Sequence, residues 1–167
     1  LPPGSKVLCS AVNIPDMFKI LSDHELVPVP VDLNPMTMAV EEADWERALT
    51  GEVRLVLVAH LLGTRANLNG LLGLCAARGI PVVEDCAQAF DGLDYAGDSR
   101  ALASLFSFGP IKTHSALGGA MGIVRDSDLR DRMRNRVSAY PRQSRWAYMG
   151  KVLKYSVLKI LSVPVFY

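Results

Sequence analysis

Four side chains whose chemistry could cooperate stand at the ends of two neighbouring apolar segments. Asp85 and Gln88 follow the first segment, and Ser107 and Lys112 lie at the end of the second. Ligands of α/β proteins bind at the carboxyl ends of parallel strands, which is where these four residues are expected. A lysine amine that is partly desolvated there is a usable nucleophile.

This combination matches the needs of pyridoxal phosphate (PLP) chemistry. The amine of Lys112 can form a Schiff base with the aldehyde. A carboxylate such as Asp85 can pair with the pyridine nitrogen and keep it protonated, so that the ring acts as an electron sink. The hydroxyl of Ser107, with backbone N–H groups, can hold the phosphate.

Each of these residues also has a structural interpretation. Asp85 with Gln88 three residues later has the form of a capping box at a helix start. Lys112 lies in an expected loop after Gly109-Pro110, where most lysines are solvated. The pair Glu84-Asp85 at a strand end could indicate a receiver-like phosphoacceptor. That module also needs a second acidic cluster near an early strand, which this sequence does not show.

Other residues near these segments have weaker claims to a functional role. His60 ends an apolar strand and is expected to be a hydrogen-bonded core residue, with a place beside the site as the alternative. His114 follows two residues after Lys112 and could reach the site or a partner subunit. Cys86 is expected to be a small buried residue.

Apolar and amphipathic runs alternate along the chain with short connections, which predicts an α/β fold with a doubly wound, mostly parallel sheet flanked by helices. The proline-containing strand is expected at a sheet edge. Strands are expected at residues 6–12, 26–31, 54–59, 80–84, 105–108 and 120–124. Helices are expected at residues 15–21, 41–49, 71–78, 126–136 and 146–161.

Composition narrows the classes of protein. The 167 residues are 50% hydrophobic and carry a formal net charge of +1, which gives no electrostatic case for nucleic acid. Three scattered cysteines and three distant histidines indicate a reduced cytosolic protein with no disulfide framework and no metal site. Glycine-rich motifs for nucleoside triphosphates or dinucleotides do not follow any expected strand.

Two segments resemble the DegT/DnrJ/StrS family of PLP-dependent sugar aminotransferases, of aminotransferase fold type I. They are VVEDCAQAF (residues 82–90) and SLFSFGPIKTHSALGGAMGIV (residues 104–124). The family pattern is E-D-x-A-Q/H-A followed by F-S-F-x-x-x-K. Weaker similarity at PVPVD (residues 28–32) and AHLLG (residues 59–63) extends the resemblance over most of the chain.

The resemblance implies a role for each residue. Lys112 would be the Schiff-base lysine and proton carrier. Asp85 would hold the pyridinium, Gln88 would bind near the phenolic oxygen, and Ser107 would contact the phosphate. The family often stacks an aromatic residue on the PLP ring, and the matching position here is Asn13 or Ile14.

The resemblance also implies an activity. It is the transfer of an amino group, with glutamate as the expected donor, to a nucleotide-linked keto-sugar, in a cytoplasmic homodimer of nucleotide-sugar biosynthesis. Sugar dehydration and a non-catalytic or regulatory role are the alternatives. Lys112 favours transamination, because the family's dehydratases replace that lysine.

The resemblance assigns residues 1–140 to an incomplete PLP-binding large domain and residues 141–167 to a connector and an amphipathic helix. The ends of the sequence suggest a fragment that would be inactive alone. The last helix carries lysines between apolar residues, so it is expected to cover a further domain or a partner subunit. A membrane-surface helix is the alternative, and a membrane span is disfavoured.

Overall fold

A computed structural model describes residues 1–92, 94–112 and 114–162 of the chain. Its elements alternate between strand and helix up to β4, as the sequence pattern predicts. In chain order they are β1 (Lys6–Ser10), α1 (Pro15–Asp23), β2 (Val27–Val31), α2 (Glu42–Ala48), β3 (Val53–Ala59), α3 (Asn69–Ala77), β4 (Val82–Asp85), β5 (Ala103–Ser107), β6 (Ala120–Val124), α4 (Ser127–Ser138) and α5 (Arg145–Leu161).

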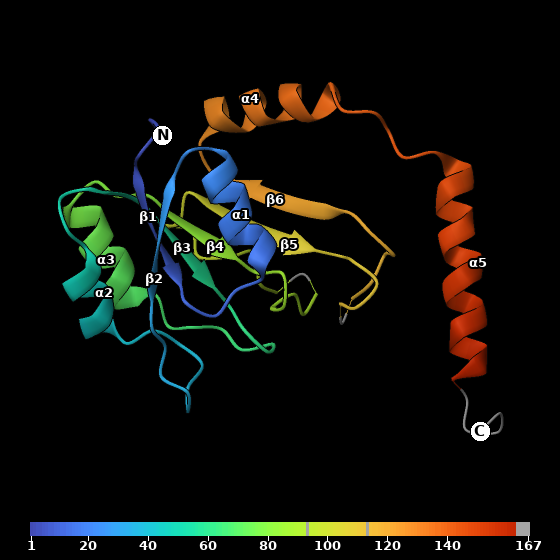
Figure 1. Cartoon of the computed structure of the whole chain (residues 1–167), viewed down its shortest axis with the longest axis horizontal. Helices are drawn as coiled ribbons and strands as arrows, with labels where there is room; N and C mark the ends of the chain where they lie inside the picture. Colours follow the sequence, from blue (N-terminus) through green and yellow to red (C-terminus); the bar gives the residue numbers. More distant parts are fainter. Residues whose placement is uncertain (93, 113, 163–167) are drawn as a thin grey trace. The chain divides into compact units, whose positions relative to one another are not determined.

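Six strands form one sheet in the order β2-β1-β3-β4-β5-β6 (Figure 1). Strands β1 to β5 are parallel, and β6 returns antiparallel to β5. The predicted mostly parallel α/β sheet is confirmed. The proline-containing strand β2 lies at the sheet edge, where a missing backbone N–H costs no ladder hydrogen bond.

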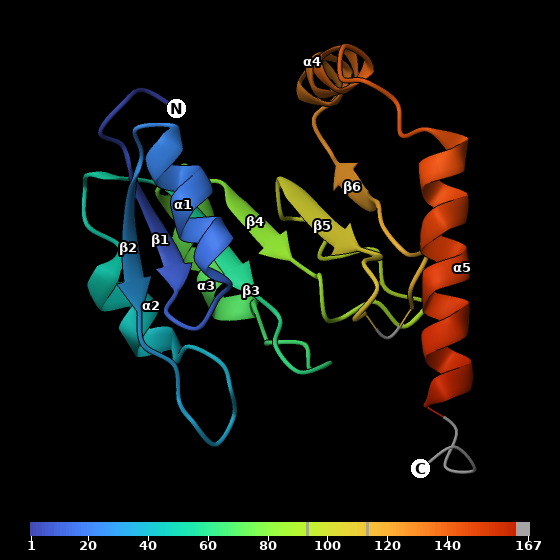
Figure 2. The ribbon, with the colours of Figure 1, turned by 45° about the vertical axis from the view of Figure 1, so that its right-hand side comes forward.

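Helices cover both faces of the parallel part of the sheet, which makes the fold doubly wound (Figure 2). On one face, Trp45 of α2 and Leu72 of α3 pack on Val56 and Val58 of β3. The side chains of β3 alternate in direction, so Leu57 packs on the other face with Leu21 of α1.

The carboxyl ends of the central strands place the candidate residues at one edge of the sheet. Asp85, the last residue of β4, is the register partner of Ala59 on β3 and of Leu105 on β5. Val82 packs toward α2 and α3, and Val83 packs toward α1. Because directions alternate along a strand, Glu84 faces the side of α2 and α3, and Asp85 faces the side of α1.

The chain divides into two compact units, and the second begins at Ser127. It contains α4 and α5, which confirm the two helices expected there. The boundary expected near residue 140 stays a prediction. Pro164, the proline that follows the helix expected at residues 146–161, lies outside the described residues. Among the helices in the described ranges, none is both long enough and apolar enough to cross a membrane.

Candidate functional site

Asp85 is half-buried at the end of β4, and its carboxylate organises the turn that follows. Its Oδ1 accepts a hydrogen bond from the N–H of Ala87 at 3.0 Å. Within the described residues between β4 and β5, the chain forms turns and no helix. A capping box at a helix start is therefore wrong here, although Asp85 does bind a backbone N–H as a cap does.

Gln88 does not complete a capping box because its side chain binds a different segment. The N–H of Leu62 donates to Oε1 of Gln88 at 2.9 Å. Since a backbone N–H can only donate, the oxygen of the Gln88 amide must face Leu62. The NH₂ group is therefore the part of this side chain that remains to donate to a ligand.

Ser107 and Lys112 come from the end of β5 and the turn after it. Ser107 is the last residue of β5 and is half-buried. It lies two residues after Leu105, the register partner of Asp85, so both side chains face the same side of the sheet. The N–H of Lys112 donates to the carbonyl of Gly109 at 3.1 Å, and the residue is half-buried rather than fully solvated.

Two cavities collect the four predicted residues at this edge of the sheet. Ser107 lines a cavity of about 400 Å³, and Asp85 lines one of about 210 Å³. Gln88 and Lys112 line both cavities, as do Ile14 and Ala87. The larger volume is in the range typical of small-molecule sites. The structure thus brings together residues that lie up to 27 positions apart in the sequence.

The two histidines near the site differ in their surroundings. His60 is 1% exposed and hydrogen-bonded, which confirms the expected core residue, and it also lines the smaller cavity. His114 lines the larger cavity, and its ring meets the ring of Phe90 edge-on, with 5.2 Å between centroids. Cys86 is fully buried, as expected.

Asn13 is a polar residue of the site to which the sequence assigned no polar role. Its side chain lines the smaller cavity with Asp85 and Lys112. Its Oδ1 accepts from the N–H of Ile14, but its buried Nδ2 finds no hydrogen-bond partner among the described residues. A buried donor without a partner indicates room for an acceptor, since leaving such a group unpaired is costly.

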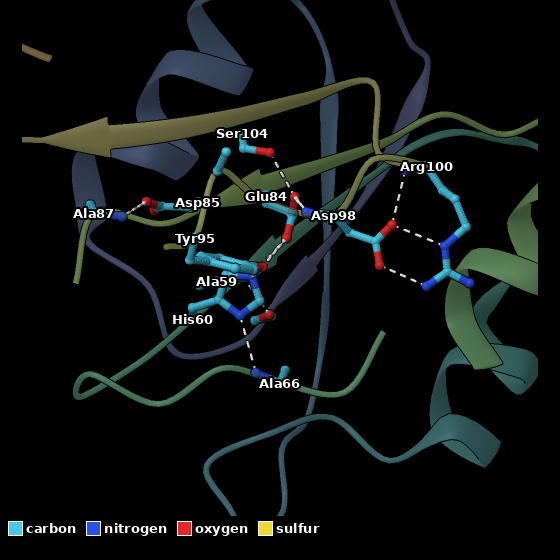
Figure 3. Close-up of polar contacts among 12 residues, drawn as sticks. Ala59, His60, Ala66, Glu84, Asp85, Ala87, Tyr95, Asp98, Arg100 and Ser104 are labelled. Atoms are coloured by element: carbon cyan, nitrogen blue, oxygen red, sulfur yellow. Dashed lines mark hydrogen bonds and ion pairs between the residues drawn. The ribbon is translucent and has the colours of Figure 1, made fainter. Parts of the chain in front are cut away.

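The role of Glu84, the residue before Asp85, was not predicted from the sequence, although this residue is fully buried and joins several segments through hydrogen bonds (Figure 3). Four donors converge on its carboxylate. They are Tyr95 Oη at 2.6 Å, Ser104 Oγ at 2.6 Å, the N–H of Asp98 at 2.8 Å and His60 Nε2 at 3.1 Å. The sequence offered one indication of this role, because a glutamate inside an expected buried strand needs hydrogen-bond partners.

The positions of the protons around Glu84 follow from the second partners of its donors. Arg125 donates to Ser104 Oγ at 3.1 Å, so the hydroxyl proton of Ser104 is directed to Glu84. Burial raises the pKa of Glu84, but the hydrogen bonds from His60, Ser104, Tyr95 and Asp98 outweigh it and lower the pKa. Glu84 is therefore an ionised carboxylate, and burial with the nearby Glu84 charge raises the pKa of Tyr95.

Stability should depend on the ionisation of Glu84. Because its folded pKa lies below the ordinary value of 4.5, its contribution is fully present above that pH and is lost as the pH falls below it. Urea unfolding of the parent chain and of Glu84→Gln from pH 7 to pH 3 should show a stability difference that shrinks below about pH 4.5. A pH-independent difference would mean that the charge of Glu84 does not stabilise the fold.

Gly97 is required where the chain passes this carboxylate. Its φ is +83°, and a Cβ there would lie 1.9 Å from Ser104 Oγ and 2.7 Å from Glu84 Oε2. Gly97→Ala should therefore lower the free energy of unfolding by about 2–4 kcal/mol, through backbone strain and disruption of the buried hydrogen bonds. Gly51→Ala is the matched control for urea unfolding, since nothing lies within 4 Å of a Cβ at Gly51.

His60, Glu84 and Cys86 place three possible metal-ligand atoms within 4.8 Å of one another. The N–H of Ala66 donates to Nδ1 of His60 at 3.1 Å, so the imidazole proton must be on Nε2. Burial raises the pKa of the Cys86 thiol to about 12, which leaves it protonated at neutral pH. Both ring nitrogens of His60 are thus engaged in hydrogen bonds, and His60 and Glu84 bind each other rather than a metal ion.

A family model places the whole site in a known group of proteins. Residues 1–155 match the model described as the DegT/DnrJ/EryC1/StrS aminotransferase family. The chain belongs to this family. The match includes both cavities and all four residues that the sequence nominated.

Relatives with curated names agree with this membership. A UDP-N-acetyl-3-dehydro-alpha-D-glucosamine 3-aminotransferase of Acidithiobacillus ferrooxidans is 33% identical over 79% of this chain and 37% of its own length. An L-glutamine:2-deoxy-scyllo-inosose aminotransferase of Streptomyces fradiae is 37% identical over 64% of the chain and 26% of its own length. A pleiotropic regulatory protein of Geobacillus stearothermophilus is 30% identical over 79% of this chain and 36% of its own length. The chain thus spans only about a quarter to a third of the length of these relatives.

Two solved structures share the fold of this chain. The sugar aminotransferase CalS13 of Micromonospora echinospora is 28% identical, with a TM-score of 0.69 over 80% of this chain and 38% of that one. NtdA of Bacillus subtilis, solved with bound cofactor PMP, is 25% identical, with a TM-score of 0.69 over 77% of this chain and 29% of the NtdA chain. The fold of this chain is therefore shared with these two proteins.

Proposed function

We propose that the protein is a PLP-dependent aminotransferase whose cofactor lies in the two cavities lined by Lys112. The observation that carries this proposal is the meeting of Lys112, Gln88, Ser107 and Asp85 around cavities that share lining residues. Family membership supports the same activity. NtdA, which shares the fold, binds PMP, the amine form of this cofactor.

The groups at the site fit PLP one by one. The cofactor has a basic ring nitrogen, a phenolic oxygen, an aldehyde and a phosphate, so it needs a carboxylate, donors and an amine. Asp85 supplies the carboxylate, and Lys112 supplies the amine. The NH₂ of Gln88 and the unpartnered Nδ2 of Asn13 are donors without competing acceptors among the described contacts. Ser107 would contact the phosphate.

The residues of this chain would divide the work of amino transfer. When bound, PLP supplies an electron-withdrawing ring that stabilises negative charge on the carbon next to the substrate amine. Lys112 would hold the cofactor through its aldehyde carbon, and its amine, once replaced there by the substrate amine, would take and return the proton at the reacting carbon. Asp85 keeps the ring nitrogen protonated through its negative charge. Gln88 donates to the phenolic oxygen.

One face of the ring would rest on an aliphatic side chain rather than an aromatic one. Ile14 lines both cavities, whereas Asn13 lines only the smaller one. We assign the ring contact to Ile14 for this reason. Packing of an isoleucine against the ring excludes water but lacks the specific geometry of aromatic pairs.

The proposed substrates are a nucleotide-linked keto-sugar as acceptor and glutamate as amino donor, in a cytoplasmic homodimer. The relative from Acidithiobacillus, named for a UDP-linked sugar, supports the acceptor. The relative from Streptomyces is named for glutamine and a keto-cyclitol, which makes glutamine the first alternative donor to compare. The donor and the acceptor would react in two half-reactions, with the amine of Lys112 moving the proton in each.

Borohydride reduction of the full-length natural protein after incubation with PLP tests the cofactor. A stable adduct that maps to Lys112 by peptide mass spectrometry supports the proposal. No adduct, with the protein folded, favours the regulatory alternative that the name of the Geobacillus relative suggests. Parallel assays with glutamate and glutamine then identify the donor, and loss of a sugar hydroxyl without amination would indicate the dehydratase alternative.

A further inference from the structure

Two loops meet at Glu84 on the face of the sheet opposite Asp85 (Figure 3). The first follows β3 and reaches Glu84 through His60. The second precedes β5 and reaches it through the hydroxyl of Tyr95 and the N–H of Asp98. The first loop also touches the site itself, because its Leu62 binds Gln88.

The ring of His60 anchors the first loop at both ends. Its Nε2–H donates to Glu84 at 3.1 Å, and its Nδ1 accepts from the N–H of Ala66 at 3.1 Å. Residues 60 and 66 are therefore held by one buried ring, and that ring is held by one buried carboxylate. Within the segment between them, Leu61 is buried, and its carbonyl accepts from the N–H and Oγ1 of Thr64. Arg65 forms an ion pair with Asp91 of the second loop.

Leu62 lies within this constrained segment in a conformation that a leucine rarely adopts. Its φ is +54°, and Gly63 follows with φ +78°. A side chain with positive φ costs free energy and persists only where the surrounding structure enforces it. In this conformation the N–H of Leu62 points to Oε1 of Gln88, which turns the NH₂ of Gln88 away from Leu62.

We propose that Glu84 is a positioning residue that fixes the orientation of Gln88 through His60 and Leu62. This proposal rests on the proposed function, in which Gln88 donates to the cofactor. Hydrogen bonds join Glu84 to His60 and His60 to Ala66, and a third joins Leu62 to Gln88. The backbone of residues 60–66 connects the first two hydrogen bonds to the third.

Only an ionised carboxylate can hold this series of hydrogen bonds. A glutamine at position 84 has one accepting oxygen and one donating NH₂ group. In one orientation its NH₂ would face the N–H of Asp98, which cannot accept a hydrogen bond. In the other it would face Nε2 of His60, which cannot accept because it carries the ring proton while Nδ1 accepts from Ala66. Glu84→Gln therefore tests the link at nearly constant volume.

Nitrogen-15 relaxation of the 167-residue chain tests the link without cofactor. In the parent chain, the Leu62 and Ala66 amides should show order parameters near those of a rigid backbone, about 0.85. Glu84→Gln and His60→Phe should lower both to below about 0.6 while the β3 amides keep their values. The His60 ring should carry its proton on Nε2 in the parent chain.

Two variants serve as controls. Tyr95→Phe removes one donor to the same carboxylate but keeps the ring, which lies 4.2 Å from the guanidinium carbon of Arg65 in the first loop. Glu46→Gln changes an exposed glutamate on α2. Both should leave Leu62 and Ala66 rigid. Unchanged order parameters in Glu84→Gln and His60→Phe, or equal loss of order in β3, would overturn the proposal.

In the full-length protein, Glu84→Gln and Gln88→Ala should both shift the pH at which the absorbance of the bound cofactor changes, whereas Tyr95→Phe should not. An identical midpoint in the parent and Glu84→Gln proteins would refute a role in the cofactor site. If the parent protein binds no PLP, the proposed function fails, while the relaxation data still decide whether Glu84 orders the loop.

Discussion

Replacing Lys112 with arginine is expected to lower the rate of amino transfer in the full-length protein by about 10,000-fold or more. Arginine keeps the positive charge but stays protonated, so it can neither form the covalent bond nor take a proton from carbon. The cavity and its other lining residues should remain, because the backbone N–H of residue 112 still donates to Gly109.

Single-turnover kinetics with the amino donor, followed by absorbance, measure this loss directly. Borohydride should leave no adduct in Lys112→Arg, although the cofactor can still bind without covalent attachment. Lys19→Arg is the matched control, since Lys19 is an exposed residue paired with Asp23 on α1. An active Lys112→Arg protein, or an adduct on another lysine, would contradict the assigned role.

Replacing Asp85 with asparagine is expected to lower kcat/KM by about 100- to 1,000-fold, because it leaves a buried cation without its partner. Asparagine keeps the oxygen that accepts from the N–H of Ala87, so the turn after β4 should survive. The melting temperature should therefore change little. This combination separates a role in charge pairing from a role in capping the turn.

Steady-state kinetics and thermal unfolding of the same full-length Asp85→Asn protein give both readouts. Asp128→Asn, an exposed position in the first turn of α4, is the matched control. If activity fell only in proportion to the folded fraction, Asp85 would be a structural residue. If activity stayed at the parent level, the ring nitrogen would not need this carboxylate.

The order and type of the elements could be predicted because each is set by local patterns. The near-continuous apolar run at residues 54–59 is of the type expected for a strand covered on both faces, and residues 56–59 are buried in β3. Trp45 and Leu49 share a helical face by their spacing, and both are in the core. Pro15 begins α1 because its fixed φ suits the first helical turn.

The direction of β6 and the turn after β4 could not be predicted from local sequence patterns. Nothing local to residues 120–124 shows that β6 runs antiparallel to β5, since direction depends on how the chain returns from Lys112. In that return, Leu117, Gly118 and Gly119 have positive φ, and the N–H of Gly118 donates to Phe108. Asp85 and Gln88 suggested a helix start by spacing alone, but Leu62, 26 residues away, binds the glutamine.

The sequence by itself determined the chemical groups of the site, because Asp85, Gln88, Ser107 and Lys112 are identified by type and by their place at strand ends. Tertiary structure alone decided how those groups are held. The orientation of Gln88, the unpartnered donor of Asn13 and the four donors around Glu84 all depend on contacts between segments distant in the sequence. A hydrogen bond is directional and short, so its partners become known only when the chain has brought them within about 3 Å.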